Sequence, residues 1–352
     1  MHVRIYNLTF GSQAFLAAWD AACSCGKNAT MVIPAGTFVL GPVLFKGPCS
    51  NAFSPALEIK GTLKALPNFT GWAWIEFHTL HELAVGGGGT LDGQGSQCWG
   101  QGHNLPTTLK FQHVNDGTVS NLSLVDSKGF HVVFHSSTSV TACGLNITAP
   151  AHSPNTDGIH LSNSSHINIT DCRISTGDDC ISVGPGIANV SISGIFCGPG
   201  HGLSVGSLGK YADEKAVMGL TVRNCTITQT TNGVRIKTWP GSPVGIARNI
   251  TFEDIVMNNV SNPIIIDQDY CPQKSCSSEP SLVQITGVRF RNVQGTSSTA
   301  VAVKLQCSPT KPCDGLHLEN INLKLMNGAA AISECFHAVG MFGGIQNPSP
   351  CL

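Results

Sequence analysis

Acidic and imidazole side chains recur at one point of a sequence pattern between residues 157 and 201. Asp157, Asp179 and His201 each stand two residues before a short apolar strand pattern, at intervals of 22 residues. If successive strands stack in parallel, these side chains form a column with a spacing of about 4.8 Å. Carboxylates this close raise the pKa of at least one of them, so a proton can be held at mildly acidic pH. A protonated acid beside an ionised carboxylate is the pair that cleaves glycosidic bonds.

Further charged residues belong to the same segment but stand off that column. Asp178 directly precedes Asp179, and neighbours along a strand point to opposite faces, so one of them must leave the column at a bend that Gly177 permits. Arg235 and Lys237 share one face of a later strand pattern. A single Asp in such a position is usually a turn residue that satisfies backbone donors. Turn residues do not require Arg and Lys opposite three acids, so the whole set indicates a functional site.

The elements that must position these residues follow from a repeat that begins near residue 117. The pattern apolar-x-apolar-x-x-apolar-x-apolar starts at 140, 167, 190, 220 and 250, with weaker copies at 288 and 316, and a second strand pattern follows each copy. Units of this length cannot bury their own apolar face, whereas stacked units can. We therefore expect an all-β fold, a parallel β-helix, in which Cys172 and Cys225 act as small core hydrophobes. A β-sandwich is disfavoured because regular Asn-Gly or Asp-Gly hairpin signals are missing.

One segment departs from the strand patterns. Residues 12–23 place apolar side chains near helical spacing after a serine, which predicts a short α-helix that caps the stack as part of an N-terminal cap at about residues 10–26. No low-complexity linker interrupts the chain, so we expect residues 1–352 to form a single domain.

Composition limits the function further. The formal net charge of −1 argues against a nucleic-acid binder that relies on overall basicity. No apolar run approaches ~20 residues, so no membrane span is expected, and the start of the sequence lacks the pattern of a signal peptide. The 15 cysteines contain no CxxC pair, so disulfides formed in an oxidising compartment are favoured over metal ligation, and the odd count leaves at least one thiol.

Eleven N-x-[ST] sequons are compatible with glycosylation of a secreted protein. Most recur at one point of the repeat, which favours a role as turn residues before strands. They begin at Asn7, Asn28, Asn68, Asn121, Asn146, Asn163, Asn168, Asn189, Asn224, Asn249 and Asn259.

Four short motifs together resemble the signature of the polygalacturonases of glycoside hydrolase family 28. They are NTDG at 155–158, GDDC at 177–180, GHG at 200–202 and RIK at 235–237, in the same order and with similar spacing. The resemblance covers nearly the whole chain. The segments IPAGTF, WIEF and GTLDGQG and the cysteine-rich end look like the plant branch, and RIKTWPGSP leans toward exo-acting, pollen-type members.

The resemblance implies a right-handed, single-stranded parallel β-helix that hydrolyses α-1,4 bonds between galacturonate units of pectin with inversion. Asp178 would then be the general acid, Asp157 and Asp179 would activate water, and His201 would orient or tune the acid. The substrate would contact four further residues, Asn155, Arg235, Lys237 and Tyr270. For Tyr270, a loop aromatic that shields the core is an equally simple interpretation. No metal or cofactor is implied, and a secreted, extracellular or cell-wall monomer is expected.

The resemblance also suggests disulfide pairs, although sequence cannot prove connectivity. They are Cys180–Cys197, Cys307–Cys313, Cys335–Cys351, Cys271–Cys276, and Cys23 or Cys25 with Cys49.

Three alternative functions stay open on the sequence. The chain could be a non-catalytic β-helix that binds acidic polysaccharide, a pectate lyase on the same fold, or a rhamnogalacturonan hydrolase. The intact NTDG and RIK motifs favour hydrolysis of unsubstituted galacturonan.

Overall fold

The computed structural model of the protein describes residues 2–4, 11–25, 29–50, 53–69, 71–100, 105–273 and 275–352. The sequons at Asn7 and Asn28 and the outer ends of the expected cap, residues 10 and 26, lie outside the described residues. The chain divides into two compact units, Met1–Asp178 and Asp179–Leu352, which we describe separately. No helix among the described residues is long and apolar enough to cross a membrane.

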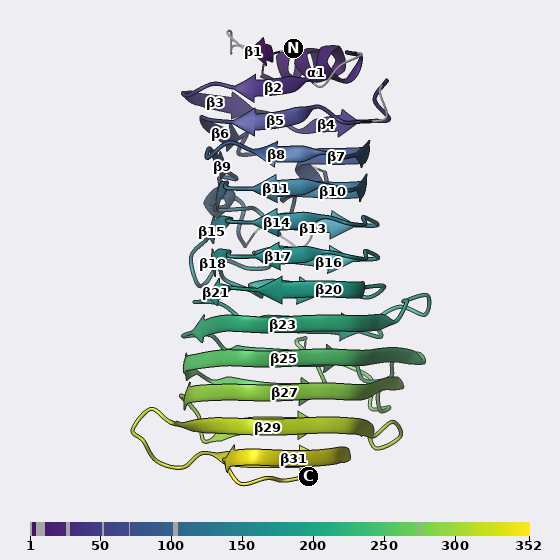
Figure 1. Ribbon diagram of the computed structural model, residues 1–352, viewed down its shortest axis with the longest axis vertical. Helices are drawn as coiled ribbons and strands as arrows, with labels where there is room; N and C mark the ends of the chain where they lie inside the picture. The colour runs from purple at the N-terminus through teal and green to yellow at the C-terminus, as the bar shows by residue number, and fades with distance from the viewer. Residues whose placement is uncertain are drawn as a thin grey trace. The chain divides into compact units, whose positions relative to one another are not determined.

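The first unit is built from three parallel ladders, to which each turn of the chain adds one strand (Figure 1). The first ladder contains β4 (Val43–Lys46), β7 (Ala73–His81), β10 (Thr107–Asn115), β13 (Val132–His135) and β16 (Ile159–Ser162). The second contains β1 (His2–Arg4), β2 (Thr30–Ile33), β5 (Ala56–Ile59), β8 (Ala84–Gly86), β11 (Thr118–Ser120), β14 (Thr141–Cys143) and β17 (Asn168–Thr170). The third contains β3 (Thr37–Leu40), β6 (Thr62–Ala65), β9 (Thr90–Asp92), β12 (Ser123–Val125), β15 (Asn146–Thr148) and β18 (Arg173–Ser175). The parallel pairing excludes an antiparallel β-sandwich and confirms the predicted parallel β-helix.

Because the register is the same from rung to rung, side chains of the same kind stack on one another inside the first unit. Phe45, Phe77, Phe111 and Phe134 occupy one column, with successive ring centroids 5.3, 5.2 and 4.9 Å apart. Each of these rings is almost fully buried. Aromatic rings combine a large buried area with favourable offset stacking, so this column stabilises the in-register stacking of the strands.

The predicted helix is α1 (Gly11–Cys23), and a short 3-10 helix, η1 (Gly95–Gln97), follows later. Trp19 on α1 packs on Phe45 with ring centroids 4.8 Å apart, and its indole N–H donates to the Lys46 carbonyl at 3.2 Å. The helix therefore covers the first end of the aromatic column, where the stack would otherwise expose apolar side chains to water.

The second unit uses longer strands. One ladder contains β19 (Ile181–Val183), β22 (Leu203–Leu208), β24 (Asn232–Thr238), β26 (Asn262–Asp267), β28 (Val301–Gln306) and β30 (Ile332–Phe336). The other contains β20 (Ala188–Ser193), β21 (Phe196–Cys197), β23 (Val217–Thr228), β25 (Gly245–Val260), β27 (Val283–Ser297), β29 (Cys313–Leu325) and β31 (Ala338–Asn347). Both β20 and β21 pair with β23, so two short strands of one rung become one long, bent strand in the next.

Asparagines at the bends of this pattern adopt left-handed backbone angles, which Asn tolerates better than most residues. Six of the sequon asparagines have a positive φ of 49–57°, which supports their interpretation as turn residues: Asn121, Asn163, Asn189, Asn224, Asn249 and Asn259. The thiols of Cys172 and Cys225 are buried in the predicted apolar columns, and burial raises the pKa of each to about 11.

The described residues form five disulfides: Cys23–Cys49, Cys180–Cys197, Cys271–Cys276, Cys307–Cys313 and Cys335–Cys351. The first of these settles the choice that the sequence left open between Cys23 and Cys25. Five disulfides indicate folding in an oxidising compartment.

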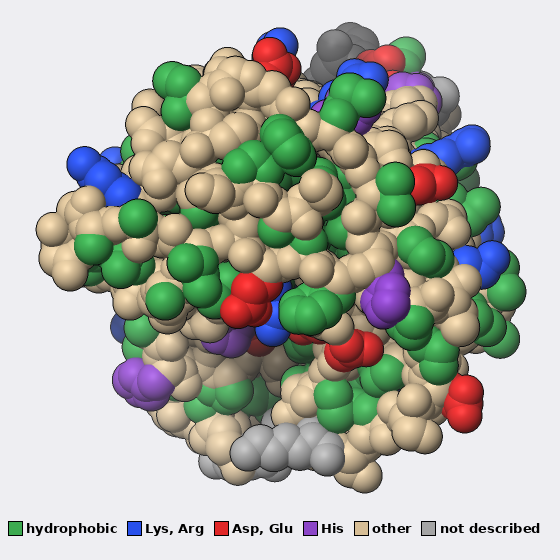
Figure 2. All heavy atoms as spheres, turned by 90° about the horizontal axis from the view of Figure 1, so that it is seen from below, with side chains coloured by type: hydrophobic (Ala, Val, Ile, Leu, Met, Phe, Trp, Pro, Cys, Tyr) green, Lys and Arg blue, Asp and Glu red, His purple; other side chains and the backbone are tan. Residues whose placement is uncertain are grey.

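The last rung of the second unit has a more apolar surface than the rungs before it. Figure 2 views the molecule from below and shows hydrophobic side chains spread over this face. The exposed apolar residues of β30 and β31 are Ile332, Phe336, Val339, Met341, Phe342 and Ile345. Each strand pairs with a neighbour on one side only among the described residues, because no described rung follows.

Candidate active site

In the first unit, Asp157 lies on the segment that leads into β16. The strand register, continued by two residues, places it in one column with Phe130 and Thr107 of the two preceding rungs. Its backbone carbonyl accepts two hydrogen bonds from His131, from the amide N–H at 2.8 Å and from Nδ1 at 3.1 Å. His131 is fully buried, and its Nε2 accepts from the Ser127 amide at 3.3 Å.

The neutral form of His131 is required for this arrangement. Burial lowers its pKa to about 4, so the ring stays neutral and carries its proton on Nδ1. The ring thus joins two rungs and fixes the backbone of Asp157. Sequence analysis did not identify His131, because a histidine within GFHVVF is indistinguishable there from an ordinary strand residue.

The bend that carries Asp178 is tied to the Asp157 segment within the same unit. The Gly177 amide donates to Thr156 Oγ1 at 3.0 Å, and that hydroxyl lies 2.6 Å from Ser153 Oγ. A Cβ on Gly177 would lie 2.0 Å from the Ser153 carbonyl oxygen, so only glycine fits. The sequence predicted that Gly177 permits a bend; the structure gives close backbone approach as the reason. Asp178 itself is half-buried.

In the second unit, Asp179 is buried and bonded to three donors. Its Oδ1 accepts from Arg235 Nη2 at 2.7 Å and from Ser204 Oγ at 2.8 Å, and its Oδ2 accepts from Lys237 Nζ at 2.8 Å. Arg235 Nε also donates to Ser204 Oγ at 3.0 Å, which closes a small network. In this structure the carboxylate partner of the two cations is Asp179.

The two cations determine the charge of Asp179. Burial alone would raise its pKa, but Lys237 and Arg235 outweigh burial and hold the pKa below its ordinary value. Asp179 is therefore ionised throughout the mildly acidic range.

His201 lies one rung after Asp179 in the same column, as the 22-residue spacing predicted. The two residues offer atoms within 4.8 Å of each other, and the Asn232 side chain donates to the His201 carbonyl at 3.3 Å. In the first unit, Asn155 is exposed and has a left-handed backbone angle, φ 51°.

Tyr270 stands beside the two cations. Its ring centroid lies 5.8 Å from Arg235 Cζ and 5.1 Å from Lys237 Nζ, within the range of cation–π contacts. Its amide donates to the Thr238 carbonyl at 3.2 Å, and Trp239 packs edge-on against its ring at 5.5 Å. Tyr270 therefore packs against the two cations and against Trp239.

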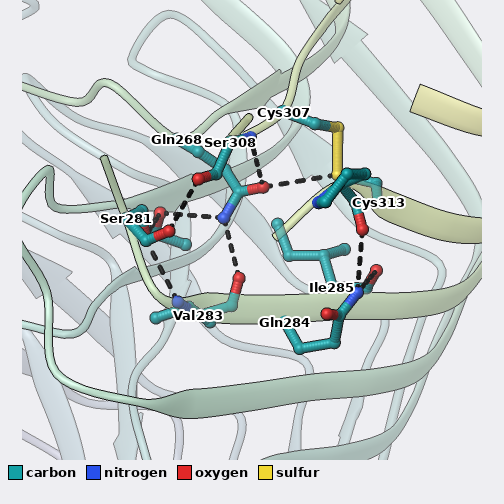
Figure 3. Close-up of a disulfide and its surroundings, with 10 residues drawn as sticks. Gln268, Ser281, Val283, Gln284, Ile285, Cys307, Ser308 and Cys313 are labelled. Carbon is teal, nitrogen blue, oxygen red and sulfur yellow. Dashed lines mark hydrogen bonds between the residues drawn. A yellow bond between two sulfur atoms is a disulfide. The ribbon is translucent and has the colours of Figure 1, made fainter. Parts of the chain in front are cut away.

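A buried polar network supports the loop that carries Tyr270 (Figure 3). The side chain of Gln268 donates to the Val283 carbonyl at 2.9 Å and accepts from the Ser308 amide at 3.0 Å. Ser308 follows Cys307, which is bonded to Cys313, so the disulfide holds the segment that anchors Gln268. Because Gln268 lies two residues before Tyr270, the network limits where the tyrosine ring can move.

Asp267 is an additional acid that sequence analysis missed. It lies in register with Lys237 on the adjacent strand, and its Oδ1 accepts from the Asp269 amide at 3.1 Å. Burial raises its pKa, so it holds a proton more readily than Asp179 does. Only the register between β24 and β26, which sequence does not fix, brings it to this site.

Comparison with known proteins places the chain in a family. The model for glycosyl hydrolases family 28 matches residues 23–339. The chain belongs to this family. Among curated proteins, family 28 relatives include an exopolygalacturonase from Platanus acerifolia, 41% identical over 96% of this chain and 93% of the relative. A polygalacturonase from Nicotiana tabacum is 44% identical over 97% of this chain and 88% of the relative.

Solved structures support the fold. An endo-xylogalacturonan hydrolase from Aspergillus tubingensis matches 98% of this chain and 99% of its own, with a TM-score of 0.84 at 24% identity. A polygalacturonase from Erwinia carotovora matches 98% of this chain and 94% of its own, with a TM-score of 0.75 at 25% identity. The right-handed parallel β-helix is thus common to this chain and these enzymes.

Proposed function

We propose that the protein is a polygalacturonase that hydrolyses α-1,4 bonds between galacturonate units of pectin with inversion. The observation that carries the proposal is the contrast between two adjacent carboxyl groups. Asp179 is buried and kept ionised by Arg235 and Lys237, whereas Asp178 is half-buried on the bend at Gly177. Neighbouring carboxyl groups in different surroundings can hold different protonation states, as acid and base catalysis requires.

In this mechanism Asp178 donates its proton to the leaving glycosidic oxygen as the bond to the anomeric carbon breaks. A water attacks that carbon from the opposite face and loses a proton to Asp157. Asp179 stays ionised and helps to activate the water. An inverting site needs a gap of ~6.5–9.5 Å between acid and base to hold this water. His201 tunes or orients the acid.

Substrate binding uses the remaining predicted residues. Arg235 and Lys237 attract a substrate carboxylate, Arg235 through its planar fork and Lys237 as a point charge. Tyr270 offers a ring face to the sugar, and Asn155 contacts a hydroxyl. The cations share their charge with Asp179, so a bound carboxylate joins an existing network.

Three further assignments belong to the proposal. Exo action is favoured over endo, because exopolygalacturonases from Platanus acerifolia and Oenothera organensis are among the relatives. We assign residues 1–352 to one catalytic domain, since the family match at 23–339 includes most of both units. The disulfides and the plant relatives support an extracellular or cell-wall location, and we propose a monomer.

The test is release of reducing ends from polygalacturonate at about pH 5. We expect Asp178→Asn to lose roughly 10²–10⁴-fold in kcat, the usual contribution of a general acid. Asp171→Asn is the matched control, since Asp171 is an exposed turn residue of the first unit, and its activity should equal that of the wild type. Equal activity of Asp178→Asn and wild type, or no activity in either, would refute the proposal.

The products separate the alternatives. Inversion yields the β-anomer first, which proton NMR detects before mutarotation. Galacturonic acid alone from the start indicates exo action, and mixed oligomers indicate endo action. Ultraviolet absorbance of an unsaturated product indicates a lyase. Release of reducing ends from rhamnogalacturonan but not from polygalacturonate indicates a rhamnogalacturonan hydrolase.

A further inference from the structure

A hollow of about 280 Å³ in the first unit lies outside the set of charged residues described above. It is lined by Trp72, Leu105, Thr107, Gly129, Phe130 and Asn155. Its volume is close to the lower end of the ~300–1,000 Å³ that is typical of small-molecule sites. Five of these six residues come from the segments that lead into β7, β10 and β13 or from the starts of those strands, which follow one another in Figure 1.

The register relates this hollow to the proposed catalytic base. Ala73, Thr107, Phe130 and Asp157 occupy one column, because Thr107 pairs with Ala73 and the pairings of Leu109 with Val132 and Val132 with Ile159 continue it. Backbone hydrogen bonds link the same rungs, from the Thr107 amide to the Trp72 carbonyl at 3.0 Å and from the Thr108 amide to the Phe130 carbonyl at 3.0 Å. At about 4.8 Å per rung, the hollow lies one to three rungs before Asp157.

Trp72 is the feature that points to a ligand. Its side chain is 75% exposed, whereas Trp74, two residues later, is 1% exposed and donates its indole N–H to the Leu40 carbonyl. An exposed indole beside a hollow provides a rigid apolar face for a sugar ring. Phe130 supplies a second aromatic ring to the lining and itself packs on His160, with ring centroids 5.1 Å apart.

None of the described residues that line the hollow has a charged side chain. The cations of the neighbouring segments are already bonded: Lys128 is buried, donates to the Gly93 carbonyl at 2.5 Å and lies over the Phe69 ring, while Lys110 pairs with Glu76 at 3.5 Å. A carboxylate placed in the hollow would lose water without gaining a cation. The methyl ester of galacturonate has no such cost, and its methyl group suits an aromatic lining.

We propose that this hollow is a sugar subsite selective for methyl-esterified galacturonate over the free acid, with Trp72 as its stacking platform. The inference rests on the proposed function for the identity of the sugar. It implies that the enzyme accepts a methyl ester on the first-unit side of Asp157, while the cations of the second unit select a free carboxylate.

Binding tests the subsite independently of hydrolysis. Fully methyl-esterified trigalacturonate is titrated calorimetrically into the Asp178→Asn protein, so that no cleavage is needed, with and without Trp72→Ala. We expect Trp72→Ala to weaken binding of the ester about tenfold, a usual loss for one aromatic contact. Phe53→Ala is the matched control, because Phe53 is another exposed aromatic of the first unit that does not line the hollow. Its affinity should be unchanged.

Trp72→Lys distinguishes ester selectivity from simple stacking. A cation at the rim should improve binding of the free trigalacturonate relative to the ester by about tenfold. The inference is overturned if the ester does not bind, if Trp72→Ala binds it as tightly as the parent, or if the parent prefers the free acid in the same way as Trp72→Lys. Circular dichroism spectra that match the parent show that the exposed substitutions leave the fold intact. Reducing-end release by the wild type, measured in parallel, reports on the proposed function alone.

Discussion

Replacing Asp179 by asparagine removes the charge to which two buried cations are bonded. The change keeps the shape of the side chain, but its new amide group would face Lys237 Nζ, which lies 2.8 Å from the present Oδ2. Two donors then oppose each other, and Lys237 is left buried without its anion. Breaking a buried ion pair on one side costs ~3–5 kcal/mol, so we expect the free energy of unfolding to fall by that amount.

The double variant Asp179→Asn with Lys237→Met isolates the physical cause. Methionine fills a similar volume without a charge, so one of the two cations left without an anion disappears, while Arg235 and Ser204 still donate to the remaining oxygen. We expect the double variant to recover about 2 kcal/mol relative to Asp179→Asn, within the ~0.5–3 kcal/mol of coupled neighbours. Both variants should be inactive, so the recovery concerns stability alone.

Urea unfolding followed by tryptophan fluorescence measures these differences, with equal m-values as a condition for comparing midpoints. Asp171→Asn serves as the control and should stay within ~0.5 kcal/mol of wild type, as surface substitutions usually do. The reasoning fails if Asp179→Asn costs less than about 1 kcal/mol, or if the double variant is no more stable than the single one.

Three other predictions follow from the same structure. Gly177→Ala places a Cβ 2.0 Å from the Ser153 carbonyl oxygen, so the bend must shift. We expect the free energy of unfolding to fall by ~1–3 kcal/mol. Because a 1 Å misplacement of a catalytic group can cost ~10²-fold in rate, kcat in the reducing-end assay should fall by about that factor. The pKa of Asp179 in the folded protein lies below its ordinary value of 3.8. The stability that its charge contributes is therefore complete above pH 3.8 and is lost as pH falls through the folded pKa. Below pH 3.8 the free energy of unfolding should depend less on pH in the double variant than in the wild type, and parallel curves would contradict this. Cys172 and Cys225, with pKa values of about 11, are about one-thousandth thiolate at pH 8; maleimide labelling and peptide mass spectrometry should find them unmodified in the native protein and modified in urea, while the half-exposed Cys143 reacts in both.

Much of the fold could be predicted from sequence because a β-helix repeats. Every rung must place apolar residues at the same points, so the pattern at 140, 167, 190, 220 and 250 was visible without any contact being known. The same repetition placed Asp157 on the segment that leads into its strand, and it placed Asp179 and His201 one rung apart. The segment that became α1 stood out because its spacing is helical in a chain of strand patterns.

The interactions that determine the position and the charge of each carboxyl group could not be predicted from the sequence. Ser204, His131 and Gln268 act through hydrogen bonds to residues 15–45 positions away, and nothing in their local sequence separates them from other polar strand residues. The pairing of Arg235 and Lys237 with Asp179 depends on side-chain reach across two rungs, which a strand pattern does not encode.

The sequence by itself determined the repeat, the place of His201 one rung after Asp179, and the family motifs, because periodic burial and turn chemistry are local properties that recur in each rung. Only the tertiary structure decided that Asp179 is ionised, that Gly177 is required by close approach to Ser153, and that Trp72 and Phe130 line one hollow before Asp157. These depend on burial and on distances between rungs. Such quantities arise when segments far apart in the chain are stacked in register, because only then are charges removed from water and placed beside their partners.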